Sequence, residues 1–191
     1  MIRKILSILI ISIVSLSGIN AQNDVSPERK KAIDSLAIEK IRDLSKYISI
    51  IGSKNTPFSE ANRVIERASE LFAPDAEIGV STISSPKIRH YKVRKYFEHL
   101  MALNYDKVTI EWYNIHYISD LKRQPDGKYV GVITIYQRFR GFDSDGIKYK
   151  DTTKKDITVY VEKKQTQIAG KLIDFWDVLL GDIKVTETKP E

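Results

Sequence analysis

The side chains best suited to proton transfer in this sequence are one histidine and a few aspartates in its C-terminal half. His116 lies in the run Trp112-Tyr113-Asn114-Ile115-His116-Tyr117. Its imidazole changes charge near neutral pH, so a His–Asp pair can accept and return a proton there. The candidate partners of His116 in such an acid–base pair are Asp174 and Asp177, with Asp156 as a third choice.

The same segment predicts one wall of a ligand pocket. If residues 108–121 form a regular strand, Trp112, Asn114 and His116 share one face of it. An indole and two polar groups on an inward face would line a pocket, and Tyr136 of the next predicted strand would add a phenol to its rim. If that face points outward, His116 instead faces solvent or bonds a cross-strand neighbour.

The spacing of metal-ligating residues predicts neither a metal site nor a cofactor site. His90 and His99 are nine residues apart, which is too far for adjacent turns of one helix face. Asp143-Ser144-Asp145-Gly146 has the start of a calcium loop, but Ile147 follows where the next ligand should be, so a hairpin turn is expected. The chain has no cysteine and no nucleotide-binding glycine motif.

A second candidate site is a run of five cations. Lysines and arginines occupy positions Lys87, Arg89, Lys92, Arg94 and Lys95. On a helix spanning residues 88–103 they would form an outer face, which is either simply solvated or docks an anionic surface, such as lipid headgroups, polysaccharide or an acidic envelope protein.

Three amphipathic helices are expected to position these residues. Ser26-Pro27 is typical of a helix start, and apolar residues recur at helical spacing up to Gly52. A second helix begins near Pro57, with Ser59 as its cap, and ends before Ala73-Pro74-Asp75. A third spans residues 88–103 and buries Val93, Tyr96, Phe97, Leu100 and Met101.

Long strands follow the helices. A short strand is expected at 77–83, and four long antiparallel strands at 108–121, 129–142, 147–162 and 171–185, separated by turns and by a polar loop at 163–170. Strands of this length curl, so the expected fold is α+β: three helices across the concave side of a curved antiparallel sheet.

The N-terminus has the layout of a secretory signal peptide. Arg3 and Lys4 precede an uncharged apolar run, and Ala21 ends the small and polar residues before a cleavage point. We expect residues 1–21 to be removed, residues 22–185 to form one domain, and 186–191 to be a polar tail. The alternative is an uncleaved anchor. Without Cys there is no lipid anchor, so the protein is not a lipoprotein.

The chain resembles the nuclear transport factor 2-like (NTF2-like) superfamily, which includes SnoaL-type cyclases and ketosteroid isomerase. The resemblance rests on Leu71-Phe72-Ala73-Pro74-Asp75-Ala76 after a helix, on the helix at 93–103 and on the later strand runs. It implies the cone described above, with an acid–base pair inside it in the enzymes of the superfamily. Phrases such as Leu180-Gly181-Asp182-Ile183 also resemble exported proteins of unassigned function from Bacteroides-type bacteria.

Two classes of function remain open from the sequence. The favoured one is a non-catalytic domain, periplasmic or extracellular, that binds a small apolar or amphipathic ligand or an envelope protein. The alternative is a small isomerase, dehydratase or cyclase using the His–Asp pair. A homodimer through the sheet is a third option. Loss of Arg3 and Lys4 lowers the formal charge from +6 to +4, and an exported protein of this charge is not expected to bind nucleic acid.

Export generates the first testable prediction. Protein recovered from the periplasm or medium of the producing cell should begin near Gln22, because signal peptidase cuts after the small residues that follow the apolar run. Intact-mass analysis measures this directly. Recovery of the full-length chain in the membrane fraction would contradict it.

Overall fold

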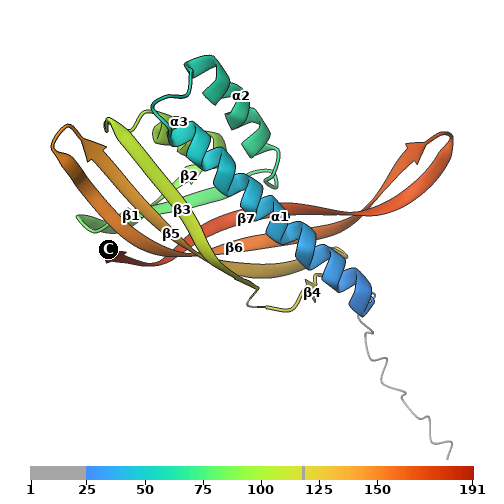
Figure 1. The fold of residues 1–191 in the computed structure, drawn as a ribbon. Coiled ribbons are helices and arrows are strands. Elements are labelled where there is room, and N and C mark those ends of the chain that lie inside the picture. The colour runs from blue at the N-terminus through green and yellow to red at the C-terminus, as the bar shows by residue number, and fades with distance from the viewer. Residues whose placement is uncertain (1–24, 118) are drawn as a thin grey trace, which may run out of the picture.

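A computed structural model describes residues 25–117 and 119–191 (Figure 1). The predicted signal peptide, residues 1–21, lies outside these ranges. The described residues form three helices and a seven-stranded sheet, and the helices pack on the concave side of the curved sheet. The predicted α+β class and the helix-covered cone are confirmed.

Helix α1 (Pro27–Gly52) is the longest helix and lies across the sheet. Ser26 caps it by accepting a hydrogen bond from Arg29 N at 3.3 Å, and Pro27 is its first residue, as predicted. Its apolar stripe, including Ile41, Leu44 and Ile48, is fully buried. The stripe packs against β3 and β7, and α2 and α3 pack beside it.

Helix α2 (Phe58–Ser69) begins where expected, but Pro57 is its cap position, and no side chain caps it. The prediction that Ser59 caps this helix is wrong because Ser59 already lies inside its first turn. Val64, Ile65 and Ala68 form the buried stripe, as predicted.

The largest correction concerns residues 88–92. They belong to strand β2 (Ser85–Lys92), and helix α3 spans only Val93–Met101. Strand β1 (Glu77–Thr82) pairs with β2 in register from Glu77↔Lys92 to Val80↔Arg89. Pairing with a neighbouring strand therefore overrides the helical pattern of this basic segment. The buried face of α3, Val93, Tyr96, Phe97 and Leu100, is as predicted.

The other strands are β3 (Lys107–Tyr117), β4 (Lys122–Arg123), β5 (Tyr129–Asp143), β6 (Gly146–Ile168) and β7 (Lys171–Pro190). The sheet order is β2-β1-β7-β6-β5-β3, with β4 paired to β5. The sheet is mixed, because β1 runs parallel to β7 through Ile78↔Ile183 while the long strands are antiparallel. Inward residues of β5, β6 and β7, such as Ile133, Ile157 and Leu180, complete the core under α1.

Strands β6 and β7 continue beyond the body as a two-stranded hairpin, which we call the arm (residues 163–175; Figure 1). The predicted polar loop at 163–170 is therefore wrong: pairing continues to Ile168↔Lys171 across a turn at Ala169 and Gly170. Ile168, Leu172, Ile173 and Phe175 are exposed on the arm.

The predicted polar tail at 186–191 is also wrong. Strand β7 stays paired with β6 as far as Asp151↔Pro190, and Glu191 forms ion pairs with Arg138 and Arg140. In the part of the chain that the structure describes, no helix is long and apolar enough to cross a membrane.

Phe97 generates a stability prediction. Its ring is fully buried and packs edge-on against Phe72 and Tyr96, so Phe97→Ala should lower the free energy of unfolding by roughly 3–5 kcal/mol. Phe58→Ala is the matched control, because Phe58 is 72% exposed and should cost far less. Urea denaturation compares them, and equal costs would show that the inner face of α3 is misassigned.

Candidate ligand pocket

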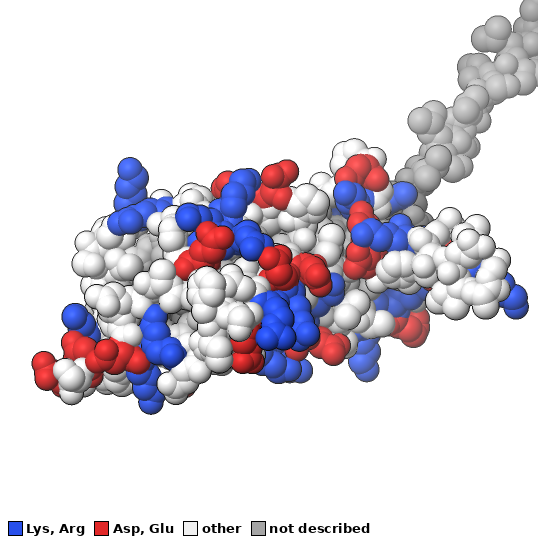
Figure 2. Space-filling view, turned by 90° about the horizontal axis from the view of Figure 1, so that it is seen from above, with Lys and Arg blue, Asp and Glu red and all other residues white. Residues whose placement is uncertain are grey.

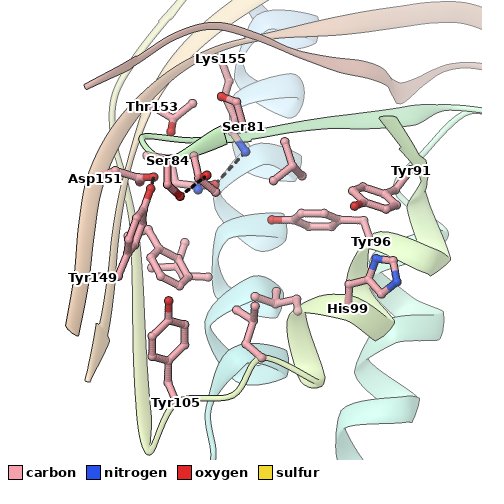
Figure 3. A pocket seen from close by; sticks show the side chains of 17 residues that line it. Ser81, Ser84, Tyr91, Tyr96, His99, Tyr105, Tyr149, Asp151, Thr153 and Lys155 are labelled. Carbon is pink, nitrogen blue, oxygen red and sulfur yellow. Dashed lines mark hydrogen bonds between the residues drawn. The ribbon is translucent and has the colours of Figure 1, made fainter. Parts of the chain in front are cut away.

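The main cavity of the described residues lies between α3, β1, β2 and the inner faces of β3, β5 and β6. Its volume is about 440 Å³. Apolar side chains, including Val80, Leu100, Ile110 and Phe139, make up much of its wall. Tyrosines from β2, α3, β6 and the loop before β3, together with polar side chains of β6, add hydrogen-bonding atoms (Figure 3). A mostly apolar wall with a few polar groups is typical of a small-molecule site.

Lys155 is the charged group buried deepest in this wall. It is 3% exposed, and its ammonium donates a hydrogen bond to Gln137 Oε1 at 3.2 Å. No carboxylate oxygen of the described residues lies within 4.0 Å of Lys155 Nζ, the limit for an ion pair. Burial lowers the pKa of Lys155 from 10.5 to about 8, and Asp151 offsets part of this shift. Near neutral pH, part of the Lys155 population therefore carries a neutral amine.

Asp151 lies four residues before Lys155 on the same face of β6 and is 4% exposed. Tyr149 donates a hydrogen bond to Asp151 Oδ2 at 2.6 Å and accepts one from Ile83 N at 3.0 Å. Burial raises the pKa of Asp151, and burial together with this hydrogen bond raises that of Tyr149 to about 12. Oδ1 of Asp151 is buried without a hydrogen-bond partner among the described residues.

Helix α3 supplies the opposite wall. Tyr96 is buried, and its ring centre lies 6.0 Å from Lys155 Nζ, while burial raises the pKa of its phenol. Figure 3 shows Lys155 and Tyr96 reaching the pocket from β6 and α3, with Tyr149 directed at Asp151. His99 is exposed at the rim, and its ring meets that of Tyr91 at 4.7 Å. Because burial raises its pKa, the phenol of Tyr96 stays protonated and remains a hydrogen-bond donor over the physiological pH range.

The residues of the predicted pocket face on β3 do not share one face of the strand. Trp112 points inward, and its Nε1 donates to Gln137 Oε1 at 3.2 Å, next to the pocket. Asn114 then adopts a positive φ of 48°, and the register with β5 slips between Tyr113 and His116. This bulge inserts one residue, which turns His116 to the other face.

His116 is exposed on the outer face of the sheet. It pairs with Thr134, three residues from the inward-facing Gln137 and therefore on the opposite face. Asp156 shares this outer face and accepts a hydrogen bond from Thr134 Oγ1 at 2.6 Å. Tyr136 also lies outside, its ring stacked on Tyr113 at 5.8 Å. Asn114 is exposed as well.

The two favoured aspartates lie elsewhere. Asp174 is on the arm, bonded to Lys163 and Gln165, which lowers its pKa. Asp177 lies at the base of the arm and accepts a hydrogen bond from Lys164 at 2.6 Å. Neither lines the pocket. The structure therefore does not assemble an acid–base pair of His116 with either residue.

The five basic residues do not form one helix face. Lys87, Arg89 and Lys92 lie on β2, whereas Arg94 and Lys95 lie on α3. Lys92 pairs with Glu77, Arg94 with Glu66 at 2.6 Å, and Lys95 with Glu98. Figure 2 likewise shows basic and acidic side chains interspersed on the face in view. Anionic docking through these five residues stays a prediction, with three of the cations already neutralised.

Sequence reasoning missed Lys155 and Asp151, although the sequence holds their signal. Strand residues alternate between faces, and Ile157, Val159 and Val161 mark the buried face of β6. Counting back by twos reaches Lys155, Thr153 and Asp151 on that same face. Charged residues at core-facing positions of a strand indicate a functional site.

No group of three or more His, Cys, Asp or Glu side chains that could hold a metal occurs in the described ranges. No protein-family model matches this chain, and no curated protein matches it at the significance required. A solved structure described as "Crystal Structure of a Hexachlorocyclohexane dehydrochlorinase (LinA) Type2" is similar, with a TM-score of 0.40 and 14% identity over 84% of this chain and 93% of that chain. A likeness of this size says nothing about activity or ligand.

Burial of Lys155 makes the stability of the protein depend on pH. Its pKa is about 8 in the folded state and 10.5 in the unfolded state. Between these values the unfolded state holds more protons, so the free energy of unfolding should rise with pH in this range. Relative to Lys155→Met, the wild type should gain roughly 1–2 kcal/mol from about pH 8 to about pH 9.5 in urea denaturation.

The neighbouring variant Lys154→Met is the control for this effect, because Lys154 lies on the outer face opposite Tyr136. It should keep the slope of the wild type. The measurements stop below pH 10 so that tyrosine ionisation does not add to the effect. Near pH 10 tyrosines of the unfolded chain begin to ionise, whereas Tyr96 and Tyr149 stay protonated in the folded state. Parallel curves for wild type and Lys155→Met would contradict the buried amine.

Proposed function

We propose that this chain is an exported NTF2-like domain that binds a small amphipathic ligand in the pocket between α3 and β6. The arrangement of three helices on the concave side of a curved sheet supports the superfamily, and the signal-peptide pattern at residues 1–21 supports export. In this proposal the apolar part of the ligand lies against Leu100, Ile110 and Phe139, and its polar part accepts a hydrogen bond from Lys155.

A single observation carries the proposal. The buried amine of Lys155 faces a largely apolar cavity, and some of its N–H groups have no acceptor among the described residues. An ammonium has three N–H groups, and Gln137 accepts from one. A buried polar group without enough partners is costly, so a core lysine of this kind would be a liability in a purely structural role. A carboxylate, sulfonate or carbonyl oxygen of a ligand satisfies it.

Two cations on β2, a strand that contributes Tyr91 to the pocket wall, favour an anionic polar group on the ligand. Arg89 pairs directly with Val80, a residue of the pocket wall, and so shares its face of the sheet. Lys87 lies two residues earlier on β2, where the register with β1 shifts after the Val80↔Arg89 pair. Neither makes an ion pair within the described ranges, in contrast to the three cations that follow them. Unpaired cations beside an opening attract anions over about 8 Å at physiological salt.

An isomerase, dehydratase or cyclase is the second candidate, and one observation favours it. Asp151 and Lys155 are titratable groups with shifted pKa values on one pocket wall, and such pairs concentrate at catalytic sites. This alternative would use the buried pair on β6 in place of His116. Binding without turnover of the bound compound separates the two candidates.

The binding test uses 8-anilinonaphthalene-1-sulfonate, an apolar fluorophore with one anionic group. At pH 6.5 the amine of Lys155 is charged, and a hydrogen bond to a charged group is worth about 1.5–3 kcal/mol. Lys155→Met should therefore weaken binding of this probe about 10- to 100-fold. Fluorescence titration measures the dissociation constants.

Lys154→Met is the matched control, since it removes the same charge from the neighbouring position on the outer face. It should change the dissociation constant by less than about twofold, because Lys154 lies on the outer face of the sheet and does not line the pocket. Equal affinities of wild type and Lys155→Met would refute the pocket as the binding site.

A further inference from the structure

The amine of Lys155 has the surroundings of a nucleophile. Its hydrogen-bond partner, Gln137, is neutral, and within the described ranges no carboxylate lies close enough to form an ion pair with it. Lys164, by contrast, lies 2.6 Å from Asp177 and 2.9 Å from Glu162, and these carboxylates raise its pKa. Burial lowers the pKa of Lys155, so its amine loses a proton more readily than a lysine in water, which leaves a lone pair on nitrogen.

The cavity beside this nitrogen has room for an organic carbonyl compound. Its volume of about 440 Å³ is within the range of small-ligand sites, and its wall is largely apolar. The ring of Tyr96 lies on one side of Nζ, at 6.0 Å from ring centre to nitrogen. Low water content favours condensation reactions that release water, and a phenol that stays protonated is a donor for a carbonyl oxygen in the same pocket.

We propose that Lys155 captures a carbonyl ligand covalently, as an imine between Nζ and the carbonyl carbon of an apolar aldehyde or ketone. The nitrogen lone pair attacks the carbonyl carbon, the nitrogen loses a proton and the carbonyl oxygen gains one, and a carbinolamine forms. Loss of one water molecule then gives the C=N bond. The reaction needs no oxidant or reductant, and water added back releases the carbonyl compound and restores the amine.

The other polar group on β6 refines the ligand class. Among the described residues, Oδ1 of Asp151 is buried without a hydrogen-bond partner, and Asp151 lies on the same face of the strand as Lys155, four residues away. At about 3.3 Å per residue the two α-carbons are roughly 13 Å apart. A carbonyl compound with a hydroxyl or amine at its far end would reach Lys155 with one end and Asp151 with the other. This inference rests on the proposed ligand pocket.

The test traps the imine with a named probe. The full mature chain is incubated at pH 7.5 with 2-naphthaldehyde and sodium cyanoborohydride, which reduces an imine to a stable amine, and peptide mass mapping locates the naphthylmethyl groups. Lys155 should be modified at least about tenfold faster than Lys154, since burial lowers the pKa of Lys155 and its amine faces the cavity that holds the probe, whereas Lys154 lies on the outer face. Bound 8-anilinonaphthalene-1-sulfonate should slow modification of Lys155 and leave that of Lys154 unchanged.

Two variants and the binding assay separate the possible failures. Lys154→Met should keep the fast adduct, and Lys155→Met should lose it and retain only slow surface labelling. If Lys155 is modified no faster than Lys154 while the sulfonate still binds in a Lys155-dependent way, carbonyl capture is wrong and the ligand pocket stands. If the sulfonate binds equally well to wild type and Lys155→Met, the proposed pocket fails, and this inference with it.

Discussion

Every second side chain of β6 points to the concave face of the sheet, and this alternation divides the inside of the protein into two regions. Near the middle of the strand the inward residues are Ile157, Val159 and Val161, which form the core under α1. Toward the start of the strand the inward residues are Asp151, Thr153 and Lys155, and these side chains line the pocket. A shift of one residue in register would bury the outward Lys154 and Asp156 instead, so the core and the pocket depend on the same pairing.

The register of β6 is held on both sides. Fifteen residue pairs join it to β5, and β7 pairs with it from Asp151 to Ile168. A bulge at Thr186 lies opposite Lys154 and Lys155, where the register with β7 slips by one residue. Bulges bend strands and occur next to binding sites. Here this register shift lies where the inward face of β6 changes from core to pocket.

Much of the fold was readable from the sequence, because most of it follows local rules. The cap at Ser26, the end of α1 near Gly52 and the turn at Gly127 each follow from residues adjacent in the chain. The segment at 88–92 was misread because its helical spacing is real, and only pairing with β1, a neighbour in space, makes it a strand. The loop predicted at 163–170 failed similarly, since its polar residues are stabilised by pairing within the arm.

The site was harder to predict than the fold, for a physical reason. One residue with a positive φ, Asn114, reverses which residues of β3 face inward, and no spacing rule reveals a single bulge. The pocket residues of β6 follow strict alternation and could have been found, had charge at a core-facing position been weighed above the acid–base chemistry of histidine.

The arm determines where the chain length of this protein can change during evolution. Its two strands pair only with each other beyond Val161, so residues there contribute nothing to the register that aligns Lys155 with the pocket. Insertions or deletions at the tip, around Ala169 and Gly170, can lengthen or shorten the arm without moving any wall of the cavity. Between Asp151 and Val161 the same change would exchange the two faces of the sheet. Length variation should therefore concentrate at the tip, while the pocket segment keeps a constant residue count.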